Sequence, residues 1–325
     1  MIRSHFANPP AEYRPMPFWF WNHRLCIDEI ERQIREMHAK GVGGFFIHGR
    51  FGLETDYLSP EWMSLVKRSV EVAKDLDMHV WLYDENPFPS GVGGGIVMRS
   101  KDNWCKYLDV VRKRVYGSES IELIIPEGKV IAAYAVDLDS LSLQIDLHEC
   151  MSPGRLSWTP PSGQWEVMVF VERLAEAPFF IYGSEPDYFQ DGMVDSWLKI
   201  THEAYANAVG EYFGNGIDGI FTDEPKIHCA YHAHDDPFTT AWFSVLPRLF
   251  KAFYGYDLTH CLPSLFMNVG PNPGKTRRDF WRLVSKEYRN RLFKRYHEWC
   301  VDNGIKLTGH LFLEEGLYAN TMYQA

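Results

Sequence analysis

The chain has 325 residues, 46% of them hydrophobic and 15% aromatic, which is enough for a large core and more than one domain. The formal net charge of -10 argues against a nucleic-acid surface, because phosphate binding needs clustered Lys and Arg. No apolar run is long enough to span a bilayer, and the first ten residues lack the apolar core of a signal peptide. Because the six cysteines show no CxxC spacing, we expect reduced or buried thiols and no disulfide framework. With neither a signal-peptide pattern nor a membrane span in the sequence, we expect a cytoplasmic protein. A secreted protein whose leader has been removed would read the same way.

The first third of the chain alternates strand-like and helix-like segments. The expected strands are the apolar runs at 17–21, 44–48 and 79–83. Asp28 and Glu31 form a capping-box pattern for the first helix, and Ser59 with Pro60 begins the second. The glycine-rich run at 91–95 lacks the Lys-Ser/Thr of a P-loop, and we predict a tight loop there.

The spacing of hydrophobic residues changes in the middle of the chain. Between about residues 107 and 175, short strand-like segments are separated by Gly, Pro and Ser turns with no helical pattern, which predicts an inserted β-rich subdomain. The alternation then resumes, with helices expected at 194–212 and 278–302 and strands at 217–222 and 305–311. The predicted domains are 1–106 and 176–325 for a β/α barrel and 107–175 for the insertion.

These elements predict a (β/α)8-type TIM barrel that is incomplete, with about five strands. Parallel strands joined by crossover helices form either an open doubly wound sheet or a barrel. No GxGxxG follows the first strand, which removes the usual reason to expect a nucleotide-binding open sheet. About three strands are missing from the usual eight, so we expect them to be supplied by another chain or to be lost.

Each predicted strand ends in polar residues that can do chemistry. The carboxyl ends of parallel strands face one rim, so we expect these side chains to gather there. They are Asn22, His48, Arg50, Asp84, Glu85, Asn86, Asp223, Glu224, His310, Glu314 and Glu315. Several carboxylates at one rim repel one another, which costs free energy unless they bind a cation or have shifted pKa values.

Two strands end in neighbouring acids, Asp84 with Glu85 and Asp223 with Glu224. Successive residues of an extended chain point to opposite faces, so one member of each pair can face the substrate while the other supports a loop or binds a metal. We favour Glu224 as the acid that faces the site, because its longer side chain reaches further over the rim. Glu85 and Asp223 are then the candidate metal ligands, with an oxygen-coordinated cation such as Ca²⁺ expected.

Aromatic residues near the same rim point to a carbohydrate substrate. Trp19, Trp21, Tyr83 and Phe88 can stack on the C–H face of a sugar, although barrel packing explains Trp19 equally well. Two carboxyl groups flanking a glycosidic bond supply the acid and the base or nucleophile that its hydrolysis requires. The predicted substrate-binding residues are Trp21, Asn22, His48, Arg50, Tyr83, Asp84, Glu85 and His310.

A second group of polar residues follows the fourth predicted strand. Its members are His228, Cys229, His232, His234, Asp235 and Asp236. They match no familiar zinc spacing, so we expect a polar active-site loop. This loop is nevertheless the basis for one alternative, a metal-dependent barrel hydrolase or isomerase that acts on other bonds.

Several segments together resemble the barrel of glycoside hydrolase family 106 and its α-L-rhamnosidase-like relatives. They are PFWFWN, GGFFIHGRFGLET, WLYDENPFPSG, GIFTDEP and LTGHLFLEE, with GRLSWTPPSGQWEV in the insertion. The resemblance implies a (β/α)8 barrel, removal of terminal L-rhamnose from glycans or glycosides, two glutamates as acid and base, and a calcium ion. Family members continue well beyond LEE, so a truncated, non-catalytic sugar-binding protein is a further alternative.

Carried onto this chain, the resemblance implies a catalytic pair of Glu224, from TDEP, with Glu314 or Glu315, from HLFLEE. Asp223 lies beside the first of these glutamates and completes the set of predicted catalytic residues. The residues that would then line the sugar pocket or the metal are Asp84, Glu85, His48 and His310.

Overall fold

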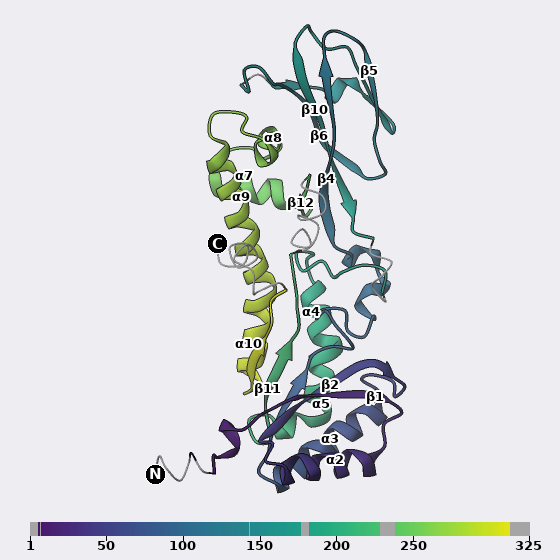
Figure 1. The fold of residues 1–325 in the computed structure, drawn as a ribbon, viewed down its shortest axis with the longest axis vertical. Helices are drawn as coiled ribbons and strands as arrows, with labels where there is room; N and C mark the ends of the chain where they lie inside the picture. The colour runs from purple at the N-terminus through teal and green to yellow at the C-terminus, as the bar shows by residue number, and fades with distance from the viewer. Residues whose placement is uncertain (1–5, 7, 143, 177–181, 228–237, 313–325) are drawn as a thin grey trace. The chain divides into compact units, whose positions relative to one another are not determined.

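The computed structural model describes residues 6, 8–142, 144–176, 182–227 and 238–312, which fall into two compact units (Figure 1). Among the described residues, the first unit comprises 6, 8–103, 182–226 and 289–312, and the second comprises 104–142, 144–176, 227 and 238–288. The second unit therefore takes in residues 238–288 in addition to the predicted β-rich insertion. None of the helices in the described ranges is both long and apolar enough to cross a membrane.

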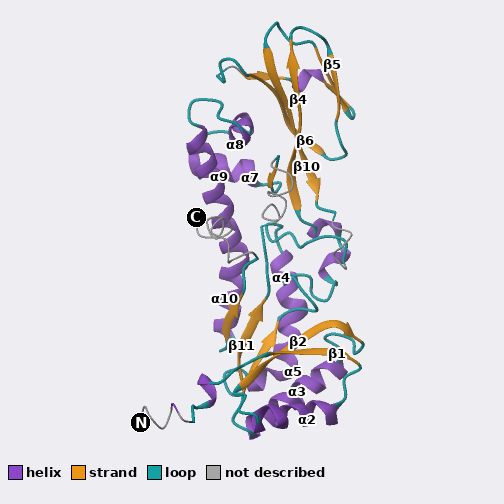
Figure 2. Ribbon diagram, viewed as in Figure 1, coloured by secondary structure: helices purple, strands orange, loops and turns teal. Residues whose placement is uncertain are grey.

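The first unit is built on a five-stranded sheet in the order β1-β2-β3-β11-β13, with every neighbouring pair parallel. Strands are orange in Figure 2, where β1, β2 and β11 of this sheet are labelled. Its strands are β1 (Phe18–His23), β2 (Gly44–Leu53), β3 (His79–Tyr83), β11 (Ile217–Thr222) and β13 (Lys306–Gly309). The predicted mixed α/β class is confirmed. Among the residues that the structure describes, β1 and β13 are the sheet's edges, and no closed barrel is formed.

Helices connect the strands of the first unit along the chain. Their bounds are α2 (Ile27–Ala39), α3 (Pro60–Asp75), α4 (Met193–Trp197), α5 (Glu203–Val209) and α10 (Lys294–Asp302), with π-helical segments η5 (Leu198–His202) and η8 (Arg289–Phe293) and short 3-10 turns η1 (Ala11–Tyr13), η2 (Val97–Arg99), η3 (Lys101–Asn103) and η6 (Gly210–Tyr212). The predicted start of α3 is confirmed, because the Ser59 hydroxyl accepts the Trp62 N–H at 3.2 Å and Pro60 is the first helical residue.

The capping box predicted for α2 is wrong. This helix begins at Ile27 with Cys26 as N-cap, and no side chain caps it. Asp28 therefore lies inside the first turn, where its charge complements the helix dipole. Ile30 and Ile34 are the buried positions of this helix, in agreement with the helical spacing of its apolar residues.

The second unit contains two antiparallel sheets, in the orders β12-β4-β10-β6-β7 and β5-β9-β8. Their strands are β4 (Lys106–Tyr116), β5 (Ile121–Ile124), β6 (Lys129–Asp137), β7 (Gln144–Asp146), β8 (Met151–Ser152), β9 (Arg155–Trp158), β10 (Gln164–Leu174) and β12 (Thr239–Ala241). The helical elements are η4 (His148–Cys150), α7 (Leu246–Tyr254), η7 (Thr259–Cys261), α8 (Pro263–Phe266) and α9 (Pro273–Tyr288). Strands β4 to β10 lie between residues 106 and 174, the stretch in which short strands without helices were predicted.

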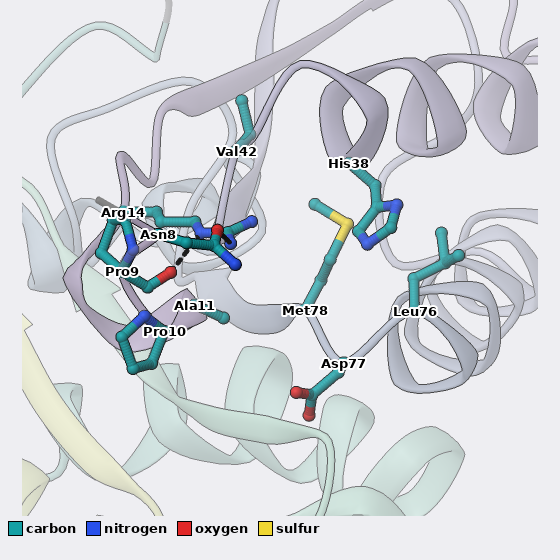
Figure 3. Close-up of a pocket in the computed structure, with 10 residues that line it drawn as sticks. All are labelled: Asn8, Pro9, Pro10, Ala11, Arg14, His38, Val42, Leu76, Asp77 and Met78. Atoms are coloured by element: carbon teal, nitrogen blue, oxygen red, sulfur yellow. Dashed lines mark hydrogen bonds between the residues drawn. The ribbon is translucent and has the colours of Figure 1, made fainter. Parts of the chain in front are cut away.

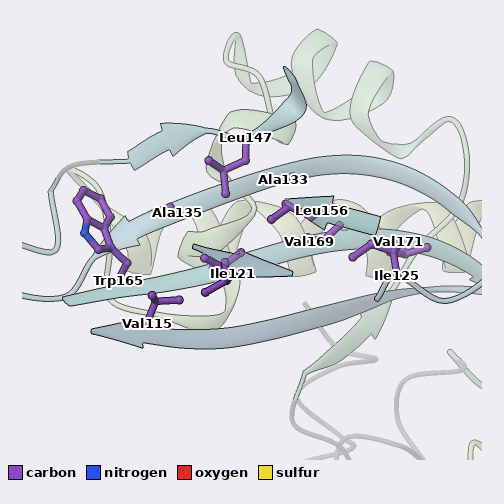
Figure 4. Packing of buried hydrophobic residues seen from close by; sticks show 11 residues of the cluster. Val115, Ile121, Ile125, Ala133, Ala135, Leu147, Leu156, Trp165, Val169 and Val171 are labelled. Carbon is purple, nitrogen blue, oxygen red and sulfur yellow. The ribbon is translucent and has the colours of Figure 1, made fainter. Parts of the chain in front are cut away.

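Alternation of side chains produces the core of the second unit. Val167, Val169 and Val171 occupy every second position of β10 and are fully buried, and Leu156 of β9 reaches the same cluster from the other sheet (Figure 4). Apolar faces of two sheets that pack together exclude water from both, which gives this unit a core of its own.

Candidate active site

The parallel sheet of the first unit is strongly curved. The ring of Phe18 on β1 has its centroid 4.9 Å from that of Phe221 on β11 and 6.4 Å from that of His310, just after β13. These strands lie three and four positions from β1 in the sheet, which would place them about 14 and 19 Å away if the sheet were flat. Rings from distant strands can meet only over a concave face, and this face therefore gathers side chains from all five strands.

The opposite, convex face packs on helices. Trp21 is 2% exposed, and its ring lies 5.0 Å from that of Trp62 on α3. The indole N–H of Trp19 donates to Gln33 on α2 at 2.7 Å. Because successive strand residues point to opposite sides, both tryptophans point away from the concave face. The predicted contact of Trp21 with substrate is not supported by this position.

At the carboxyl ends of β11 and β13, four of the predicted site residues come together. The carboxylate of Asp223 accepts the Tyr83 hydroxyl at 2.6 Å, and its other oxygen lies 3.7 Å from Nδ1 of His310. The backbone N–H of Glu224 donates to the His310 carbonyl at 3.2 Å. The His310 side chain is about half exposed and that of Asp223 is 14% exposed, so this group lies at the surface of the unit.

The backbone of Glu224 has a positive φ of 47°, an unusual conformation for a residue with a side chain. The left-handed conformation costs about 1–2 kcal/mol and persists only where surrounding contacts impose it. Strain of this kind is concentrated at functional sites. Strand β11 ends at Thr222, so Asp223 and Glu224 are not consecutive residues of an extended strand. The expectation that their side chains point to opposite faces therefore does not apply to them.

His48 and Tyr83 form a stacked pair on the concave face, with ring centroids 3.5 Å apart and planes inclined by 17°. Burial lowers the pKa of His48 to about 4, and its Nδ1 lies 2.8 Å from the Gly49 carbonyl. The imidazole is therefore neutral at pH 7. Burial and the neighbouring Asp223 raise the pKa of Tyr83, which keeps its hydroxyl protonated as a donor.

Asp84 is fully buried within a hydrogen-bond network. It accepts the hydroxyls of Ser90 at 2.5 Å and of Tyr296 on α10 at 2.9 Å. The Ser90 oxygen in turn accepts the Asp223 N–H at 2.7 Å, and the Ser90 N–H donates to the Asp223 carbonyl at 2.9 Å. Desolvation raises the pKa of Asp84, whereas these donors oppose the rise. The network joins the end of β3 to the end of β11, and neither Ser90 nor Tyr296 was predicted from sequence.

The Glu85 carboxylate accepts hydrogen bonds from the backbone of a glycine-rich loop. It is fully buried, and its two oxygens accept the backbone N–H groups of Asn86 and of residues 91–94 at 2.7–3.2 Å. Gly93 and Gly94 have φ of 58° and 59°, which lets consecutive N–H groups converge on one anion. Desolvation raises the pKa of Glu85 to about 7, against the effect of the amides. The predicted roles of Glu85 in binding substrate or calcium are not supported, because the loop already occupies both oxygens.

The two remaining substrate-binding predictions lie toward the edge of the sheet. Asn22 is exposed on β1, and Arg50 is half-buried on β2, which extends to Leu53 instead of ending at residue 48 as predicted. Arg50 shares the strand parity of His48 and therefore belongs to the concave side.

Other predictions fall on parts of the chain that the structure does not describe. These are Glu314 and Glu315, together with the loop residues His228, Cys229, His232, His234, Asp235 and Asp236. Within the described ranges, no group of three or more His, Cys, Asp or Glu side chains could hold a metal ion.

A cavity of about 330 Å³ opens at the opposite end of the strands (Figure 3). Arg14 before β1, His38 at the end of α2 and Met78 before β3 are among its lining residues. The Arg14 guanidinium donates to the side-chain oxygen of Asn8 at 2.9 Å. This cavity lies at the amino ends of the strands and the candidate site lies at their carboxyl ends, so the two are separate.

Comparison with known proteins supports the fold. No family model matches the chain, and no curated protein matches it. Among solved structures, a rhamnosidase from Novosphingobium sp. PP1Y is similar, with a TM-score of 0.61 and 14% sequence identity. The match covers 96% of this chain and 47% of the rhamnosidase, so the chain spans about half the length of that protein. The likeness is one of fold, and it extends across both units.

Proposed function

We propose that this chain forms part of the active site of a glycoside hydrolase that releases a terminal deoxysugar, such as α-L-rhamnose, from glycans or glycosides. The observation that carries the proposal is the group of Asp223, Glu224 and His310 at the strand ends, beside a concave face lined with aromatic rings. The fold likeness to a rhamnosidase supports the same class of enzyme.

In the proposed mechanism Glu224 is the general acid that protonates the glycosidic oxygen. Glu314 or Glu315 is the second carboxyl group, acting as the base that activates water or as the nucleophile. Asp223, held by the Tyr83 hydroxyl, and His310 are placed to accept and donate hydrogen bonds to sugar hydroxyls. A neutral His48 stacked on Tyr83 gives the sugar ring a flat wall without adding charge.

Calcium belongs to the family that the sequence resembles, and its fit to the described residues is limited. Glu85 does not fit, because five backbone N–H groups already bind its oxygens. Asp223 retains one oxygen without a short hydrogen bond, since His310 lies 3.7 Å from it. One carboxylate oxygen is far from the six to eight ligands that Ca²⁺ takes, so no step of the proposed mechanism uses the ion.

Hydrolysis of aryl α-L-rhamnosides tests the proposal. Glu224→Gln keeps the shape of the side chain but removes the proton donor, and we expect turnover to fall by about 10²–10⁴-fold. The loss should be smaller for substrates with highly acidic leaving groups, which need little protonation. Glu36→Gln, which changes an exposed glutamate on α2, is the matched control and should leave turnover unchanged.

Two results would contradict the proposal. Full activity of Glu224→Gln would remove this residue from the mechanism. Saturable sugar binding without turnover by the wild-type chain, measured by calorimetry on the same preparations, would favour the non-catalytic sugar-binding alternative.

A further inference from the structure

Arg50 is surrounded by phenylalanine rings. Its guanidinium carbon lies 4.9 Å from the centroid of Phe88, 5.2 Å from that of Phe20 and 5.7 Å from that of Phe51. A cation close to an aromatic face is attracted to the ring, and three such contacts restrict where the guanidinium can move. The rings therefore position the charge and shield it from part of the solvent.

The hydrogen-bonding capacity of Arg50 is not used within the described part of the chain. There, Arg24, Arg32 and Arg68 each pair with a glutamate, whereas no carboxylate or carbonyl accepts from Arg50. A guanidinium carries five N–H donors in a planar fork, and phenylalanine rings offer them no oxygen. That fork matches the paired oxygens of a carboxylate or a sulfate.

The rings beside this charge are themselves accessible. Phe20 is 49% exposed and Phe51 is 55% exposed, and grouped exposed apolar side chains are typical of a binding surface. An apolar ring face beside a fixed cation suits a sugar that presents C–H groups on one side and an anionic substituent on its edge.

A short series of contacts connects Arg50 with the proposed catalytic group. Phe20, which contacts Arg50, has its centroid 5.0 Å from His48; His48 stacks on Tyr83, and Tyr83 bonds Asp223. Three side chains thus separate the guanidinium from Asp223. An anion bound by Arg50 would belong to a neighbouring residue of the glycan, and not to the sugar whose bond is broken.

We propose that Arg50, with Phe20, Phe51 and Phe88, forms a subsite for an acidic sugar, one bearing a carboxylate or a sulfate, next to the deoxysugar that is released. This inference rests on the proposed function for its place in the reaction, because the subsite selects the glycan to which that deoxysugar is joined. Binding itself requires no turnover.

The test compares the binding of D-galacturonate, D-galactose 6-sulfate and D-galactose to the full chain by calorimetry or ligand-observed NMR at low ionic strength. We expect one of the anionic sugars to bind about tenfold more tightly than galactose, since a charge-assisted bidentate contact is among the stronger hydrogen bonds. Preference for galacturonate identifies a carboxylate as the anion, and preference for the 6-sulfate identifies a sulfate.

Substitutions test whether Arg50 is the source of the preference for an acidic sugar over galactose. Arg50→Met keeps an apolar stem against the rings and should abolish the preference for the acidic sugar while leaving galactose affinity within about twofold. Arg50→Lys should retain part of it, because the charge stays while the fork is lost. Arg24→Met is the control, as Arg24 is exposed and paired with Glu61. Equal wild-type affinity for acidic and neutral sugars, or a preference that survives in Arg50→Met, would overturn the subsite. Absence of deoxysugar release would instead contradict the proposed function.

Discussion

Replacing Ser90 by alanine tests whether the network beneath the candidate site holds two strand ends together. The hydroxyl of Ser90 donates to Asp84 at 2.5 Å and accepts the Asp223 N–H at 2.7 Å, and the residue is fully buried. Removing it leaves the amide of Asp223 without an acceptor, at a cost of about 1–3 kcal/mol, and removes a bond to an acidic group worth about 1.5–3 kcal/mol. We expect the free energy of unfolding to fall by about 3–5 kcal/mol.

Urea unfolding at pH 7 measures this loss, with Ser100→Ala as the matched control. Ser100 is exposed and its hydroxyl makes only long contacts with Asp102, donating to the carboxylate at 3.4 Å and accepting the backbone N–H at 3.3 Å, so the control should change stability by less than about 0.5 kcal/mol. Tyr296→Phe removes a second hydroxyl that donates to Asp84, and the double variant should show a coupling of about 1 kcal/mol. A loss below about 1 kcal/mol for Ser90→Ala, together with strict additivity, would refute the reasoning.

Two further predictions concern burial. His202 is fully buried with no hydrogen-bond partner for either ring nitrogen among the described residues, and burial lowers its pKa to about 3. The unfolded chain binds a proton near pH 6.5 and the folded chain does not, so this group reduces stability as the pH falls, by about 2 kcal/mol between pH 7 and pH 5. His202→Leu should lose that much less over the same range in paired unfolding curves, and an unchanged pH dependence would show that His202 is not its source. In the second unit, Leu156→Ala should cost about 2–5 kcal/mol in urea unfolding, because Leu156 is fully buried in the core cluster; a loss under 1 kcal/mol would mean that this cluster is loosely packed.

Local patterns in the sequence were sufficient for most of the fold. The apolar runs at 17–21, 79–83 and 217–222 correspond to strands β1, β3 and β11, and Ser59 caps α3 as predicted. Signals of this kind depend on residues a few positions apart, since the faces of strands and helices repeat every two or three to four residues. The same reasoning was wrong for the start of α2, where Asp28 lies in the first turn instead of capping it.

Tertiary structure determined whether each candidate site residue is buried and hydrogen-bonded or lies at the surface. Sequence alone put Asp84, Glu85 and Asp223 together at one rim as acids at strand ends, but Asp84 is bonded by Tyr296 from 212 residues away and Glu85 is enclosed by the amides of its own glycine-rich loop. Asp223 reaches the surface beside His310.

What the sequence alone determined was where the strands run and which polar residues end them, because these follow from local periodicity. The tertiary structure decided that the sheet curves far enough for Phe18 to meet Phe221, and that Trp21 points toward the helices. Curvature and the choice of face depend on strand register and on packing between distant segments. A carboxylate becomes available for chemistry only where those contacts leave its oxygens uncovered, and no local pattern contains that information.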